Sequence, residues 1–67
     1  MTLRELRVFH WRECLRFRAH EQRHRNQHSP LWVINEHQKK ADFHLSCVQC
    51  LNQLFPNLGD TAENDDN

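Results

Sequence analysis

The chain has 67 residues, with nine basic and nine acidic side chains and 37% hydrophobic residues. A chain this short is at most one domain, and it buries too little of its surface to enclose a large active site. Its core alone supplies only roughly 3–5 kcal/mol of stability. One glycine and two prolines are too few for a fold built on tight β-turns, so we expect an all-α protein.

Residues 2–26 are predicted to form a first helix. This segment has no Gly or Pro and is rich in Leu, Arg and Glu, which favour helix. Thr2 and Glu5 have the spacing of a capping box, which starts a helix. On a helical wheel one flank carries Leu3, Leu6, His10, Cys14 and Phe17, and the adjoining flank carries Val8, Trp11, Leu15 and Ala19. This apolar arc is wider than one partner helix can cover.

Residues 30–55 are predicted to form a second helix. Ser29 is its expected N-cap, Pro30 its first residue, and Pro56 its end, because proline disfavours helix in the residue before it. The expected apolar face carries Trp32, Val33, Phe43, His44, Cys47, Cys50, Leu51 and Leu54. Four further residues widen that face: Ile34, Ala41, Leu45 and Val48.

Two helices of similar length and a short turn predict an antiparallel hairpin over residues 1–56. Residues 57–67 are predicted to be a disordered tail, because the charged side chains from Gly59 onward are all acidic. Residues 1–26, by contrast, carry seven arginines against three glutamates. Either the basic half meets an acidic partner, or it is a solvated face with a solubilising tail.

Five residues can form a metal site in the expected register, in which His10 faces Cys47 and Cys14 faces His44. With Cys50 one turn further along, mixed imidazole and thiolate ligands suit a closed zinc site. The run from His44 to Cys50 resembles in part the His-x3-Cys-x2-Cys signature of zinc-binding anti-sigma factors, with one residue fewer after the histidine. That resemblance implies zinc and another histidine from an earlier helix. We favour the alternative that the cysteines are small core residues, so no cofactor is expected and zinc is second.

The run from His20 to His24 matches the His-Glu-x-x-His pattern of zinc metalloproteases. Six histidines in a short chain make a chance match easy, and a hairpin of this size has no cleft. We therefore expect no catalytic residues, no enzyme activity and no small-molecule substrate. His20, His24, His28 and His37 lie near the expected turn and can titrate between about pH 5 and 8.

The width of both apolar arcs favours protein–protein interaction. The predicted surface comprises Val8, Trp11, Leu15, Ile34, Ala41, Leu45 and Val48. The simplest partner that would bury this surface is a second copy of the chain, which gives a homodimeric four-helix bundle. The alternative partner is a larger protein. The leading interpretation is a small non-enzymatic regulatory or adaptor protein.

Two alternatives remain open from the sequence. A nucleic-acid-binding protein would use the arginines of the first helix, with Arg12, Arg16 and Arg23 as candidates, although its arginines lie all round the wheel. A zinc-stabilised transcription regulator is third. No apolar run is long enough to cross a bilayer, and an odd cysteine count favours reduced thiols, so we expect a cytoplasmic protein without a membrane partner.

Overall fold

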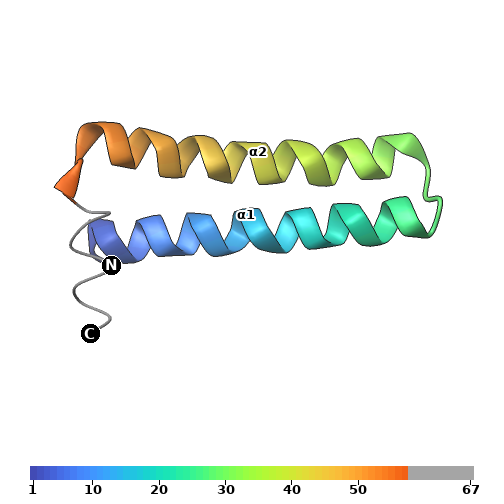
Figure 1. Ribbon diagram of the computed structural model, residues 1–67, viewed down its shortest axis with the longest axis horizontal. Helices are drawn as coiled ribbons and strands as arrows, with labels where there is room; N and C mark the ends of the chain where they lie inside the picture. Colours follow the sequence, from blue (N-terminus) through green and yellow to red (C-terminus); the bar gives the residue numbers. More distant parts are fainter. Residues whose placement is uncertain (58–67) are drawn as a thin grey trace.

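The computed structural model describes residues 1–57, which form two long helices. Helix α1 spans Leu3–Asn26 and helix α2 spans Leu31–Leu54. The two lie side by side in opposite directions, joined by a short turn (Figure 1). The predicted all-α hairpin is confirmed for this part of the chain. The predicted tail lies outside the described residues except for Asn57, and dimerisation stays a prediction.

The predicted start of α1 is confirmed. The Thr2 hydroxyl accepts a hydrogen bond from the Glu5 backbone N–H at 3.1 Å, and the Glu5 carboxylate accepts one from the Thr2 N–H at 3.2 Å. This reciprocal pair satisfies two backbone donors that a helix otherwise leaves free at its first turn. Three basic residues stand in the last turn, where the carbonyl ends of the helix favour positive charge.

The turn differs from the prediction at Ser29. Pro30 is the N-cap of α2, and it has no side-chain group to cap with. Ser29 instead binds back to α1, because its hydroxyl lies 2.8 Å from Nδ1 of His24 and its N–H donates to the His24 carbonyl at 2.9 Å. His28 adopts φ 56°, a left-handed conformation that costs a residue with a β-carbon about 1–2 kcal/mol.

The end of α2 agrees with the prediction. Leu54 is the last helical residue, and Phe55 turns out of the helix with φ −135° and ψ 72°. The ring of Pro56 explains this, because it clashes with a helical conformation in the residue before it. Neither α1 nor α2 combines the length and the apolar composition that crossing a bilayer requires.

The seam between the helices follows a seven-residue repeat. Its buried residues are Cys14, Ile34, Ala41 and Val48. The three on α2 are spaced by seven, which is the periodicity of a coiled-coil seam. Two further sets repeat at the same interval and are partly buried: His37, His44 and Leu51 on α2, and His10, Phe17 and His24 on α1. Histidines therefore occupy seam positions that are usually aliphatic.

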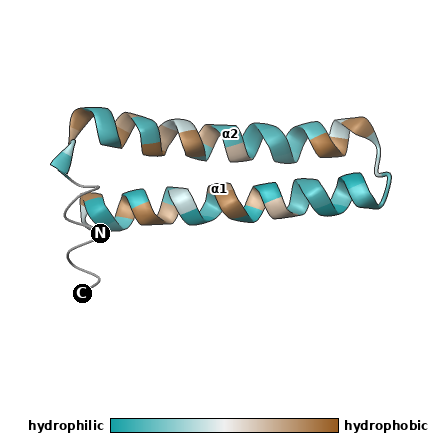
Figure 2. Cartoon of the chain, viewed as in Figure 1, coloured by the Kyte–Doolittle hydropathy of each residue, from teal (hydrophilic) through white to brown (hydrophobic). Residues whose placement is uncertain are grey.

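The apolar face predicted for α2 is correct only in part. Val33, His44, Cys47 and Leu51 are half-buried, whereas Cys50 is exposed. Trp32, Phe43 and Leu54 are all exposed, although they were expected against α1. On α1, Leu3 is exposed as well. The hydropathy of the two helices follows the same irregular pattern, with hydrophobic positions scattered around α2 and few in the half of α1 nearest the turn (Figure 2). Large apolar side chains thus remain outside the seam.

Candidate functional site

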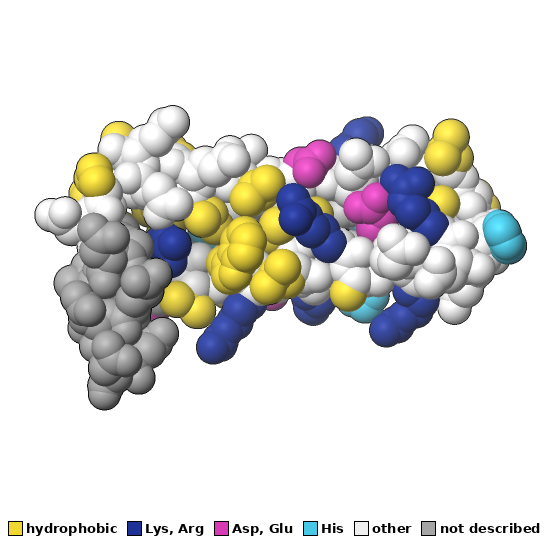
Figure 3. Space-filling view, viewed as in Figure 1, with side chains coloured by type: hydrophobic (Ala, Val, Ile, Leu, Met, Phe, Trp, Pro, Cys, Tyr) yellow, Lys and Arg dark blue, Asp and Glu magenta, His cyan; other side chains and the backbone are white. Residues whose placement is uncertain are grey.

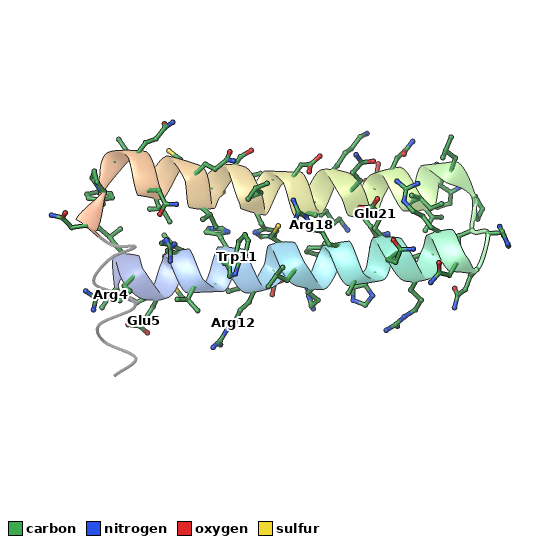
Figure 4. The ribbon with its side chains drawn as sticks, viewed as in Figure 1. Arg4, Glu5, Trp11, Arg12, Arg18 and Glu21 are labelled. Carbon is green, nitrogen blue, oxygen red and sulfur yellow. The ribbon has the colours of Figure 1, made fainter. Side chains whose placement is uncertain are left out.

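Four of the seven residues predicted for the interaction surface lie outside the buried seam. Trp11 and Leu15, about one turn apart on α1, are 42% and 47% exposed. Val8 on α1 and Leu45 on α2 are half-buried. Figure 3 shows hydrophobic side chains gathered over both helices near mid-length, and Figure 4 shows Trp11 pointing from α1 toward α2. We call Val8, Trp11, Leu15 and Leu45 the outer apolar face.

The other three residues of the predicted surface are inside the hairpin. Ile34, Ala41 and Val48 are only 6%, 1% and 5% exposed, so the prediction that they face a partner is wrong. The reason is the seven-residue repeat, which turns these three positions, rather than their larger neighbours, toward α1. They stabilise the hairpin and are closed to any partner while it is folded.

Charged side chains surround the outer apolar face. Arg18 and Glu21 point from α1 toward α2, whereas Arg12 points away from the hairpin (Figure 4). Glu21 is bound by Arg25, with a carboxylate oxygen 2.7 Å from a guanidinium nitrogen. An apolar centre with a charged rim is the usual anatomy of a protein interface.

The arginines predicted to contact phosphates are accessible. Arg12, Arg16 and Arg23 are all exposed and lie within about 40° of one another on the wheel of α1. Arg16 is also paired with Glu13 at 2.7 Å and lies over the ring of Phe17, 4.9 Å from its centroid. This pairing reduces the positive charge that one of the three candidates can offer to a phosphate.

The five candidate metal ligands are dispersed, apart from one contact. His10 and His44 meet across the seam with their Nδ1 atoms 2.8 Å apart. Cys14 is fully buried, Cys47 is half-buried and Cys50 is exposed, and all three are free thiols. Within residues 1–57, no three side chains of His, Cys, Asp or Glu are placed so as to hold a metal ion. The core role that we favoured for the three cysteines fits Cys14, whereas the exposed Cys50 is outside the core.

The contact between His10 and His44 is a structural hydrogen bond. Two neutral imidazoles make it only when one Nδ1 carries a proton and the other offers a lone pair. Burial lowers the pKa of His10, the charge of His44 lowers it further, and Glu13 opposes both effects. The ring of His44 also stacks on Phe17, with 5.8 Å between centroids and 7° between planes. The expected register is thus reproduced to within about one turn.

The side chains of the metalloprotease-like run are used within the hairpin. Glu21 accepts from Nε of Arg25 at 2.9 Å, and His24 is bound to Ser29. The rings of His20 and His24 also pack against the ring of His37 on α2. A signal for this packing was present in the sequence, because His10, Phe17 and His24 repeat every seven residues.

Comparisons of the chain with models of protein families, with curated proteins and with solved structures give no match. The class that the structure defines is therefore a small helical hairpin with apolar side chains on its outside.

Proposed function

We propose that this protein is a small non-enzymatic regulatory or adaptor protein that acts through the outer apolar face. The observation that carries the proposal is the exposure of Trp11 and Leu15 side by side on α1. Tryptophan is among the residue types that contribute most to binding energy at protein interfaces. The exposed leucine one turn away widens the contact that such an anchor makes.

The partner that we favour is a second copy of the chain. Two identical hairpins related by a two-fold axis can lay their outer apolar faces against each other and form a four-helix bundle. The half-buried Val8 and Leu45 would then complete their burial, which a single hairpin leaves unfinished. Burying apolar area in this way contributes about 25 cal/mol per Å². Docking on a larger helical protein is the other form of the same function.

Replacing Leu15 with glutamate should dissociate such a dimer and leave the hairpin folded. The side chain is half-exposed, so the change adds charge to the interface and removes little from the seam. Sedimentation equilibrium at micromolar concentration should show a wild-type dimer and a Leu15→Glu monomer, a loss of affinity of about 30-fold or more. Circular dichroism should report the same helix content for both.

The matched control is Leu31→Glu, the same change at an exposed leucine in the first turn of α2. This variant should remain a dimer, because Leu31 is remote from the outer apolar face along the hairpin. A wild-type chain that sediments as a monomer would contradict self-association. Dissociation by Leu31→Glu but not by Leu15→Glu would place the interface at the turn.

A second candidate, binding to nucleic acid, is favoured by one observation, the exposed stripe of Arg12, Arg16 and Arg23. If this stripe contacts phosphates, affinity should fall steeply with salt, and Arg12→Gln should reduce the slope by about one unit. Fluorescence anisotropy with labelled DNA and RNA measures this. Gln22→Ala, at an exposed neutral position of α1, is the control, and no binding at low salt would exclude the candidate.

A further inference from the structure

The seam near the turn is filled by aromatic rings. His37 of α2 lies against α1, its ring centroid 4.8 Å from that of His24 and 5.8 Å from that of His20. The ring centroid of Phe17 lies 6.4 Å from that of His20 and 6.3 Å from that of His37. All three histidines are half-buried, whereas His28 in the turn is exposed. We call His20, His24 and His37 the histidine cluster.

Hydrogen bonds fix two members of the cluster in place. Nδ1 of His37 lies 2.8 Å from the carbonyl oxygen of Val33, and a carbonyl can only accept, so this nitrogen carries the proton. Nδ1 of His24 lies 2.8 Å from the hydroxyl of Ser29 in the turn. A proton gained in acid by His37 would therefore go to Nε2, leave its hydrogen bond intact and place a positive charge within the cluster.

The charged groups around the cluster are mainly positive. On α1, Arg16 and Arg23 act on His20, and on α2 the Lys40 ammonium lies over Phe17, 5.6 Å from the ring centroid. Burial lowers the pKa of His20, and Arg23, His37, Arg16 and His24 lower it further, in that order. A neutral imidazole is thus the form that fits this end of the hairpin.

The carboxylates near this end are already bound to other cations. Glu21 of α1 pairs with Arg25 at 2.7 Å, and Glu36 of α2 lies 3.6 Å from the ammonium of Lys39. On the other side of Phe17, Glu13 pairs with Arg16. Protonated imidazoles in the cluster would consequently face one another and nearby arginines, with these carboxylates already engaged.

We propose that the histidine cluster is a pH-sensitive latch, closed while its imidazoles are neutral and opened at the turn end of the hairpin by their protonation. A charge on His37 would lie 4.8 Å from the ring centre of His24 and 5.8 Å from that of His20, and like charges this close repel more strongly in a half-buried site than in water. Few buried aliphatic side chains oppose that repulsion here, since Ile34 and Ala41 are the buried residues nearest to the turn. The latch is independent of the proposed docking function, because it shares no residue with the outer apolar face.

The direction of the pH effect follows from proton linkage. In the unfolded chain His20 titrates near its ordinary value of about 6.5, whereas in the hairpin its pKa is lower. As the pH falls through about 6.5, the unfolded chain therefore binds more protons than the folded chain, and the hairpin loses stability. Above about pH 7 both states are neutral at this site and the stability is fully present.

Thermal unfolding followed by circular dichroism tests the latch. For the wild-type chain, Tm should be lower by about 5 °C or more at about pH 5 than at about pH 7.5. His37→Gln keeps a polar side chain at the centre of the cluster but cannot become positively charged. It removes the repulsion that His37 exerts on His20 and His24, so the difference between the two pH values should shrink by at least about half. The control is His28→Asn, which removes an exposed histidine and supplies a residue that tolerates the left-handed φ.

The comparison of variant and control isolates the cluster, because His10, His44 and the carboxylates are present in both. An equal pH difference in His37→Gln and His28→Asn would overturn the proposal. His20→Gln provides a second variant if His37→Gln fails to fold at neutral pH, and it should reduce the difference as well. Amide hydrogen exchange gives the location: at about pH 5 protection should be lost first around His37, and an earlier loss around Val48 would also overturn it.

Discussion

Val48→Glu is expected to abolish the folded hairpin. Val48 is almost fully buried in the seam, so the substitution removes about 1.5–3 kcal/mol of apolar burial. It also brings a carboxyl group into the seam without a partner, at a further cost of about 1–3 kcal/mol. Together these losses match the roughly 3–5 kcal/mol that a core of this size supplies. Circular dichroism at 25 °C should show low helix content and no cooperative melting.

Leu54→Glu is the matched control, because it makes the same kind of change at an exposed position on the same helix. It should alter stability by less than about 0.5 kcal/mol, as exposed substitutions usually do. If Val48→Glu remained folded and only altered self-association, Val48 would belong to an interface between copies. That result would contradict the seam described here.

Ala41→Leu is expected to lower Tm by about 5–20 °C. Ala41 is 1% exposed, and the three additional carbon atoms of leucine have no space between the helices. Overpacking of this kind costs about 1–3 kcal/mol, even though leucine is more hydrophobic and a good helix former. A thermal melt with a full unfolding baseline measures the effect.

The control for this prediction is Ala19→Leu, the same substitution at an exposed alanine on α1. Its Tm should stay within a few degrees of the wild-type value, since helix propensity hardly changes and no neighbour is displaced. A Tm for Ala41→Leu that equals or exceeds that of the control would mean that the seam has room beside Ala41. The tight packing inferred from burial would then be wrong.

The course of the backbone could be predicted from the sequence. Thr2 and Glu5 form their capping box, Pro56 follows the end of α2, and both helices end within one residue of the predicted limits. These features depend on local chemistry, which neighbouring residues determine on their own. Ser29 is the exception, because a residue far along the helix, His24, competes for its hydroxyl.

The seam could not be predicted by counting apolar residues. The predicted face of α2 was centred on large aromatic side chains such as Trp32 and Phe43, which are exposed. The small side chain of Ala41 is buried instead, because it allows the two helices to approach each other. His37 was not counted on the predicted face, although it is half-buried in the seam. A search for apolar residues at a spacing of seven, without regard to their size, would have found Ile34, Ala41 and Val48 together.

The candidate site was predicted in part. Trp11 and Leu15 are exposed as expected, because an adjoining flank of α1 cannot face the same partner helix as Cys14. The metal ligands depended on the side chains reaching one point, and that is set by rotamers and by competing bonds. The hydrogen bond between His10 and His44 is such a bond, and sequence spacing contains no information about it.

The bond that joins Ser29 to His24, together with the packing of His24 on His37, also bears on how the chain assembles. His24 and His37 are 13 residues apart, whereas Arg7 and Asn52, which are hydrogen-bonded at 2.7 Å near the open end, are separated by 45. Closing the longer loop costs about 1 kcal/mol more in chain entropy. Contacts at the turn therefore have the lowest cost in chain entropy and can form first. The remaining contacts between the helices can then form in order from the turn toward the termini. Histidine protonation at the turn would therefore act on the nucleus of folding and slow the rate at which the hairpin forms.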